Sequence, residues 1–116
     1  MERYLLLIRE DLKRVGRMSE EERLECIREM TRWTESLAES GNYIGGEPLV
    51  TTGKYVSKDQ VLSDGPFIEA KEGVSGYIAI KAENLNQAAS IAQGCPLVMR
   101  NEMVIEVRPV LPFHNP

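Results

Sequence analysis

The sequence is poor in the residues on which metal binding and much acid–base catalysis depend. Its 116 residues include one histidine, His114, and two cysteines, Cys26 and Cys95. The cysteines lie in separate helical patterns, and their spacing predicts neither a metal site nor a disulfide framework. Because no phosphate-binding loop is found either, we expect no metal and no cofactor. We expect both cysteines to be buried thiols in a reducing cytoplasm.

The sequence also lacks a long apolar run and an excess of positive charge. No stretch approaches the roughly 18 apolar residues that a membrane span needs, and residues 1–4 do not begin a secretory leader. There are 18 acidic and 14 basic residues, which gives a net charge of -4, and no cluster of Lys and Arg that would neutralise a phosphate backbone. We therefore expect a cytoplasmic protein without membrane association and without direct contact to nucleic acid.

The length of the chain and its 42% content of hydrophobic residues predict one domain covering residues 1–116. Residues 4–8 are apolar on both alternating faces, as in a central strand that is covered on two sides. Residues 11–17 are polar and include Gly16, so we expect a connecting loop there.

A long amphipathic helix is predicted next. Ser19 and Glu22 match a capping box at its start, and Gly41 supplies a left-handed stop at its end. Arg23 falls within the apolar stripe, although it lies in the first turn. The other members of the stripe recur at intervals of three or four residues and are expected to pack on the core: Leu24, Ile27, Met30, Thr34, Leu37 and Ala38. Cys26 and Trp33 lie along one edge of this stripe.

The middle of the chain predicts irregular β structure. Gly45 and Gly46 interrupt residues 42–50, so we expect a short, irregular strand with a bulge or a close backbone approach. Residues 51–56 and 60–63 favour strands and are separated by a short turn, which predicts a small hairpin. Residues 68–74 have mixed charge and no clear period, and we expect a loop.

The last third predicts strand, helix and strand. Residues 76–82 alternate as a strand, Asn84 and Gln87 repeat the capping pattern of a helix that ends at Gly94, and residues 103–108 form a strand that Pro109 stops. The order predicts an α+β fold, a ferredoxin-like βαβ-βαβ sandwich with an inserted β-hairpin and an antiparallel sheet. Because both helices cover one face, we expect a second copy to cover the other and form a homodimer.

The stretch Asp64-Gly65-Pro66-Phe67 joins the two halves and is the candidate site loop. Pro66 fixes its own φ and forces Gly65 out of the helical region, so Asp64 lies on a stiff, non-helical backbone. Phe67 offers an apolar anchor for the loop. A carboxylate held in this way is positioned for acid–base work, but Asp before Gly is also a common turn former that bonds its own backbone. Both readings of Asp64 remain open from local chemistry alone.

Several separated motifs resemble the DGPF-domain branch of the YCII-related proteins. They cover nearly the whole chain and occur in the expected order: Gly45-Gly46-Glu47 with Leu49, Asp64 to Phe67 followed by Glu69, Lys71 and Glu72, then Gly76-Tyr77, Cys95-Pro96 and Glu106 to Pro109. The resemblance implies a dimeric α/β-barrel domain of bacterial type. It also implies that relatives include small enzymes with a His–Asp pair, one of them a dehydrochlorinase that acts on a chlorinated aromatic compound.

The resemblance carries over only one member of that pair. Asp64 corresponds to the aspartate of the family's loop, whereas residues 30–34 of the first long helix, where relatives tend to have the histidine, contain none. His114 lies in the C-terminal tail, where we expect a surface residue. Glu106 and Arg108 alternate onto one face of the last strand, so they either line a cleft with Asp64 or pair across the dimer.

Two functions of different class remain open. The first is an enzyme in which Asp64, partly desolvated beside Phe67, acts as general acid or base in a cofactor-free lyase or isomerase reaction on a small organic molecule. Tyr77 or Arg108 would stabilise developing negative charge on that substrate. The second is a non-catalytic dimer that binds a ligand or partner. Proteins similar to this branch are often associated with extracytoplasmic-function sigma factors, which implies an accessory role in transcription.

Overall fold

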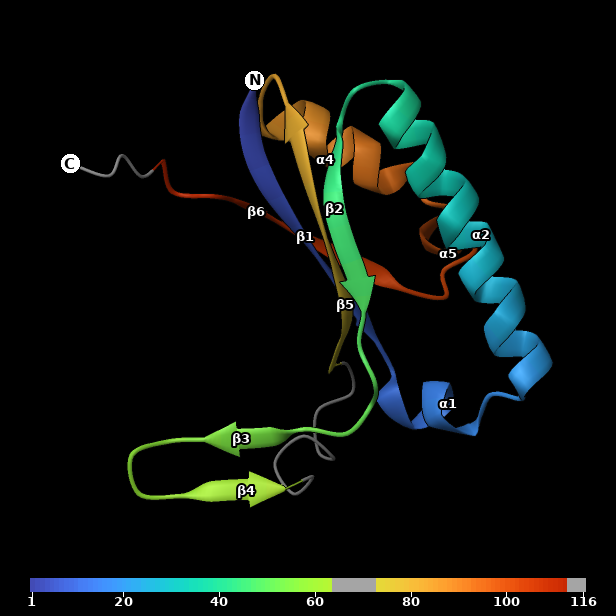
Figure 1. Cartoon of the computed structure of the whole chain (residues 1–116), viewed down its shortest axis with the longest axis vertical. Coiled ribbons are helices and arrows are strands. Elements are labelled where there is room, and N and C mark those ends of the chain that lie inside the picture. Colours follow the sequence, from blue (N-terminus) through green and yellow to red (C-terminus); the bar gives the residue numbers. More distant parts are fainter. Residues whose placement is uncertain (64–72, 113–116) are drawn as a thin grey trace.

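The computed structural model describes residues 1–63 and 73–112. Their elements follow the chain in the order shown in Figure 1. They are β1 (Glu2–Glu10), α1 (Leu12–Arg17), α2 (Glu20–Glu39), β2 (Tyr43–Pro48), β3 (Lys54–Val56), β4 (Val61–Ser63), β5 (Gly73–Ala82), α4 (Leu85–Gln93), α5 (Pro96–Met99) and β6 (Val104–Pro109).

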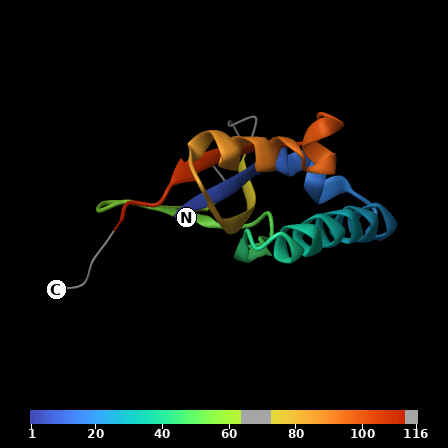
Figure 2. The same cartoon turned by 90° about the horizontal axis from the view of Figure 1, so that it is seen from above.

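Four strands form one antiparallel sheet in the order β2-β5-β1-β6, and β3 pairs with β4 in a separate two-stranded sheet. The two central strands are therefore β5 and β1, and the edge strands are β2 and β6. This is the strand order of a ferredoxin-like fold, so the predicted α+β class and the inserted hairpin are confirmed. Seen from above, α2 lies beside β2 and α4 beside β6 (Figure 2).

The core lies between the sheet and the helices because alternate residues of the central strands point to that side. Tyr4, Leu6 and Ile8 of β1 are buried there, and they form one cluster with side chains of α2, α4 and α5. Leu5 and Leu7 of β1 point to the opposite face and are half-buried. The prediction of a central strand is therefore confirmed, since β1 lies between β5 and β6, while the helices of this chain cover only one of its two faces.

α2 begins and ends as its sequence predicts. Glu22 donates its backbone N–H to the Ser19 hydroxyl, and its carboxylate accepts the backbone N–H of Ser19. Gly41 follows the helix with a φ of +82°, the left-handed conformation that glycine adopts without a steric penalty. Trp33 and Leu37 are buried in the core, whereas Ile27 is 46% exposed. Cys26 and Met30 pack against this core from a partly buried position, so the predicted stripe faces the sheet but only Trp33 and Leu37 of the helix are buried.

Two sequence predictions about local structure were wrong. Residues 11–17 were expected to be a loop, but Leu12–Arg17 form α1, because the Asp11 side chain accepts the backbone N–H groups of Lys13 and Arg14 and so caps the helix. The loop expected over residues 68–74 is contradicted at its end, since β5 begins at Gly73 and pairs there with Glu10.

β2 and the hairpin behave as predicted. The register of β2 against β5 shifts between Tyr43 and Gly45, which is the irregularity expected from the paired glycines. Lys54–Val56 and Val61–Ser63 pair as a hairpin with Val56 opposite Val61. Figure 1 shows this hairpin projecting from the end of the sheet that is distant from α4.

Candidate functional site

A cavity of about 620 Å³ lies between the N-terminal half of α2, α1 and the sheet. Its size is within the range typical of small-molecule sites. Most of its lining is apolar, and three methionines contribute to it. The lining residues are Ile8, Glu10, Val15, Gly16, Met18, Arg23, Cys26, Ile27, Met30, Thr31, Thr34, Tyr43, Gly46, Glu47, Pro48, Leu49, Val50, Thr51, Ser75, Tyr77, Ile78, Leu97 and Met103.

The cavity explains why the apolar stripe of α2 divides into two parts. Cys26, Ile27 and Met30 line the cavity, whereas Trp33 and Leu37, one to three turns further along the helix, pack in the core. The stripe therefore continues along one face of the helix, but the surface opposite its first turns is hollow.

Glu10 is the most enclosed carboxylate of the cavity wall, with a side chain that is 15% exposed. It lies at the end of β1, two residues after buried Ile8, and so projects to the helix side of the sheet. Its Oε2 accepts a short hydrogen bond from the Ser75 hydroxyl, and its Oε1 lies 3.2 Å from Nη2 of Arg14. Both carboxylate oxygens are therefore held in place.

A β-bulge places Ser75 beside Glu10. Gly76 pairs with Ile8 and Val74 pairs with Arg9, so Ser75 is the additional residue between two register pairs. Bulges of this kind redirect a side chain and are common next to functional sites. The backbone carbonyl of Ser75 also accepts the N–H of Leu49 at 2.8 Å, which ties the bulge to the chain after β2. Ser75 and Leu49 both line the cavity.

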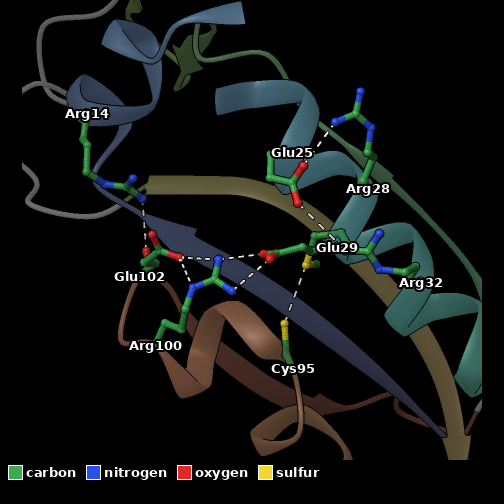
Figure 3. A network of polar contacts seen from close by, with 9 residues as sticks. Arg14, Glu25, Arg28, Glu29, Arg32, Cys95, Arg100 and Glu102 are labelled. Atoms are coloured by element: carbon green, nitrogen blue, oxygen red, sulfur yellow. Dashed lines mark hydrogen bonds and ion pairs between the residues drawn. The ribbon is translucent and has the colours of Figure 1, made fainter. Parts of the chain in front are cut away.

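A network of charged groups borders the same region (Figure 3). Arg100 donates to both carboxylate oxygens of Glu29 at 3.1 and 2.6 Å and to Glu102 at 2.9 Å. Arg14 donates to the backbone carbonyl of Glu102 at 3.1 Å. The hydrogen bonds from Arg100 lower the pKa of Glu29. The network thus connects α1, α2 and the loop before β6, three segments that are far apart in the sequence.

The two cysteines differ in their surroundings, contrary to the expectation that both are buried. Cys95 is fully buried with its Sγ 3.6 Å from Sδ of Met30, whereas Cys26 is half-buried and lines the cavity. Desolvation raises the pKa of both thiols, and for Cys26 the nearby carboxylates of Glu102 and Glu10 raise the pKa further. Cys26 is therefore close to the charged network as well as to the cavity.

Tyr77 is the predicted site residue that lines the cavity. Its hydroxyl donates to Glu47 Oε1 at 3.3 Å across the β2–β5 pair. The charge of Glu47, followed by desolvation and this hydrogen bond, raises the pKa of Tyr77. The phenol therefore keeps its proton at neutral pH. Because Tyr77 alternates with buried Ile78 and pairs with Leu7, its side chain lies on the sheet face that the helices leave uncovered.

The structure separates Arg108 from this cavity. Arg108 pairs in register with Leu5, on the sheet face that the helices leave uncovered, and its Nη1 lies 3.2 Å from Glu106. Arg9 also donates to Glu106 at 2.8 Å, and these two hydrogen bonds, the one from Arg9 first, lower the pKa of Glu106. Within one chain, Glu106 thus pairs with both arginines on the uncovered face. Three other residues discussed from the sequence lie outside the described residues: Asp64, Phe67 and His114.

Sequence reasoning missed Glu10, Ser75 and Arg23 as cavity residues. Glu10 continues the alternation of Tyr4, Leu6 and Ile8, so its side of the sheet could have been found from the strand pattern. The sequence gives no such signal for Ser75. The bulge that turns its side chain toward Glu10 arises from the pairing of β5 with β1, which no local pattern shows. For Arg23 the signal is its position in the apolar stripe of α2, since a charged residue there indicates that the stripe faces more than a core.

Across residues 1–63 and 73–112, no three side chains of His, Cys, Asp or Glu gather as a metal-binding group. Among the helices of these same ranges, none has both the length and the apolar composition that a membrane crossing requires.

Comparison with known families and proteins gave one match. The sequence model of the YCII-related domain matches residues 3–114. The match covers almost the entire chain, including every described helix and all strand residues except Glu2. No curated protein matches the chain.

Proposed function

The chain belongs to the YCII-related domain family, and from this premise we propose that it acts on a small organic molecule held in the cavity beneath α2. The proposed reaction is a cofactor-free lyase or isomerase step. Such a step removes a proton from one atom of the substrate and returns it to another or to a leaving group, so one well-placed carboxylate can perform it.

One observation carries the proposal: a cavity of about 620 Å³ that is partly open to solvent has a fixed carboxylate, Glu10, in an otherwise mostly apolar wall. Apolar surroundings strengthen electrostatic interactions with a bound molecule. The hydroxyl of Ser75 beside Glu10 provides a second polar group at the same point.

Two carboxylates compete for the acid–base role in this proposal. Asp64 has the sequence argument, because a rigid loop carries it and it matches the family's loop aspartate. Glu10 has the structural argument given above. Phe67, Tyr77 and Arg108 are the proposed substrate-binding residues, and among these Tyr77 lines the cavity. The assignment between Asp64 and Glu10 is the first question for experiment.

A second candidate function is ligand binding without chemistry. It is favoured by the fact that both oxygens of Glu10 already accept hydrogen bonds, from Ser75 and Arg14, so that Glu10 would have to give up one of these partners to contact a substrate proton. In this alternative the chain is a ligand- or partner-binding homodimer that acts as an accessory to sigma-factor-dependent transcription. In both proposals the protein is cytoplasmic, where Cys26 and Cys95 remain free thiols.

The test is a thermal-shift screen of small aromatic and aliphatic hydroxy compounds, followed by proton NMR of each hit in deuterated buffer. A ligand that binds the folded state raises the melting temperature, and acid–base chemistry exchanges a carbon-bound proton for deuterium even without net turnover. We expect Glu10→Gln or Asp64→Asn to reduce exchange by about 100- to 10,000-fold. Glu35→Gln, on the exposed face of α2, is the matched control and should leave exchange unchanged.

Each outcome separates the candidates. If hits bind to the wild-type protein but no proton exchanges, the enzyme proposal is wrong and the binding alternative remains. If exchange occurs and neither carboxylate variant slows it, both acid–base assignments are wrong. If no compound raises the melting temperature of the wild-type protein, the cavity is not a ligand site of this class.

A further inference from the structure

One face of α2 presents a charged group at the end of an apolar stripe inside the cavity. Arg23, Ile27, Met30 and Thr34 follow one another at intervals of four, three and four residues, and all four line the cavity. At a rise of 1.5 Å per residue, this row extends over roughly 16 Å. Its first member is an arginine, its middle is apolar and its last member is a hydroxyl.

Arg23 differs from the other charged residues of the cavity because its side chain has no partner among residues 1–63 and 73–112. Glu10 is bound by Arg14 and Ser75, and Glu47 accepts the hydroxyl of Tyr77. For Arg23, no ion pair or side-chain hydrogen bond connects it to another residue of the described ranges. The exposed acidic residues beside it in the first turn, residues 20–22, include none that pairs with it.

A guanidinium group at the edge of an apolar cavity favours a particular class of ligand. Its planar fork matches a carboxylate or sulfonate in two parallel hydrogen bonds. The apolar body of such a ligand would lie along Ile27 and Met30, and the thioethers of Met18, Met30 and Met103 adapt to aromatic or branched shapes. The row on α2 thus matches a molecule with an anionic group at one end and an apolar body.

We propose that the cavity selects amphipathic organic acids, whose anionic group binds Arg23 and whose apolar body occupies the methionine-lined interior. This inference rests on the proposed function in one respect, namely that the cavity binds an organic molecule. It adds the chemical class of that molecule and the residue that recognises its charge.

Two dyes with the same skeleton test this selection. Anilinonaphthalene sulfonate carries an anionic group, whereas N-phenylnaphthylamine is its uncharged counterpart. We expect the wild-type protein to bind the sulfonate more tightly, and Arg23→Gln to weaken sulfonate binding about tenfold, the effect of losing one charge-assisted hydrogen bond. Binding of the uncharged dye should not change in this variant. Both affinities are measured by fluorescence titration of the folded protein.

Two further variants test whether the loss of sulfonate binding is due to the guanidinium group of Arg23. Arg28→Gln removes the same charge from the same helix, but Arg28 is paired with Glu25 and lies outside the cavity lining, so both dyes should bind it as they bind the wild-type protein. Arg23→Lys keeps the charge and loses the fork, so its affinity for the sulfonate should be intermediate. Cys26 reports the location, because a dye in the cavity should slow alkylation of this thiol by iodoacetamide.

The outcomes distinguish this inference from the function on which it rests. If both dyes bind, both protect Cys26, and Arg23→Gln affects neither dye, the cavity remains a ligand site but the selection for acids is wrong. If the sulfonate binds without protecting Cys26, it lies elsewhere and the assignment to Arg23 in the cavity is also wrong. If neither dye binds the folded protein, the inference fails together with the cavity as a site for such molecules.

Discussion

Gly46 lies where the backbone of β2 comes into contact with β5. A Cβ atom at this position would be 2.5 Å from the carbonyl oxygen of Tyr77 and 2.9 Å from Cα of Ile78, whereas a Cβ at Gly45 would have no atom within 4 Å. Because the obstructing atoms at Gly46 include backbone, they cannot rotate away. We expect Gly46→Ala to lower the free energy of unfolding by about 1–3 kcal/mol, as overpacking does. Urea denaturation monitored by circular dichroism measures this change.

Gly45→Ala is the control for that experiment. It makes the same substitution at the preceding residue of the same strand, where space is open, and should change the free energy of unfolding by less than about 1 kcal/mol. Equal losses in the two variants would contradict the close approach at Gly46. Because Gly46 also lines the cavity, its variant should be tested for dye binding as well as for stability.

At the scale of single residues, the sequence predicted which side chains alternate along a strand better than it predicted what surrounds each of them. The alternation in β1 places Leu6 and Glu10 on one face and Leu5 on the other, but an apolar run does not indicate which of the two faces the helices cover. Which part of the helix side is packed and which is hollow depends on how far α2 stands from the sheet. The direction of Ser75 depends on a bulge between β5 and β1, and no local pattern encodes such a bulge.

The helices show where local patterns stop being informative. α2 was predicted from its capping box and its stripe, because 20 residues give several turns over which a period can be recognised. α1 has six residues and α5 has four, too few for a period. α1 depends on the cap supplied by Asp11, whereas Gly16 and the polar character of residues 11–17 favour a loop. Cys95 precedes Pro96, which is favoured in the first turn of a helix.

Arg100 holds α2 against the segment between α5 and β6, and this gives a pH-dependent prediction. The pKa of Glu29 is lower in the folded protein than its ordinary value of 4.5, first because of the hydrogen bonds from Arg100. A lowered carboxyl pKa stabilises the fold above the unfolded pKa, and this contribution is lost as the pH falls through the folded pKa. We therefore expect Arg100→Gln to be destabilised at pH 7, and the difference from the wild-type protein to shrink toward about pH 3.

A double-mutant cycle isolates the pair. Arg100→Gln, Glu29→Gln and the double variant are unfolded with urea at both pH values, and the coupling between the two positions should be present at pH 7 and reduced at the acidic pH. Solvent screening will keep the coupling free energy small, because the Arg100 side chain is 47% exposed. Arg28→Gln, in the exposed pair with Glu25, serves as the reference. A coupling that is the same at both pH values would contradict the assignment to Glu29.

At the scale of the whole molecule, the topology was predictable and the cavity was not. The order of strands and helices, with the two capped helices and the central apolar strand, restricts the chain to few arrangements, and the ferredoxin-like sheet is one of them. The hollow beneath α2 arises from the relative placement of α1, α2 and β2, which is set by long-range packing. The family resemblance predicted the fold but not the separation of α2 from the sheet that forms the cavity.

The shape of the chain predicts a second copy. Its Cα radius of gyration is 15.5 Å, compared with about 13 Å for a compact domain of this length. The helices cover one sheet face, and the opposite face presents Leu5 and Leu7 of the central strand β1 beside Ala79 and Tyr77 of β5. A homodimer that joins these faces would cover them with the same surface on each chain, as a two-fold interface requires.

Leu5→Glu is the variant that tests this dimer without disturbing the isolated chain. The new carboxylate would lie opposite Arg108 in the register of β1 and β6, so one chain can accommodate it, whereas two facing sheets would bring two such charges into a desolvated interface. We expect the wild-type protein to sediment at twice the 13.1 kDa mass of the chain and Leu5→Glu at the chain mass. Leu24→Glu places the same charge on α2, where Leu24 is 45% exposed, and should remain dimeric. A wild-type protein that sediments as a monomer at every concentration would show that the sheet face is not a dimer interface, and the proposed homodimer would then be wrong.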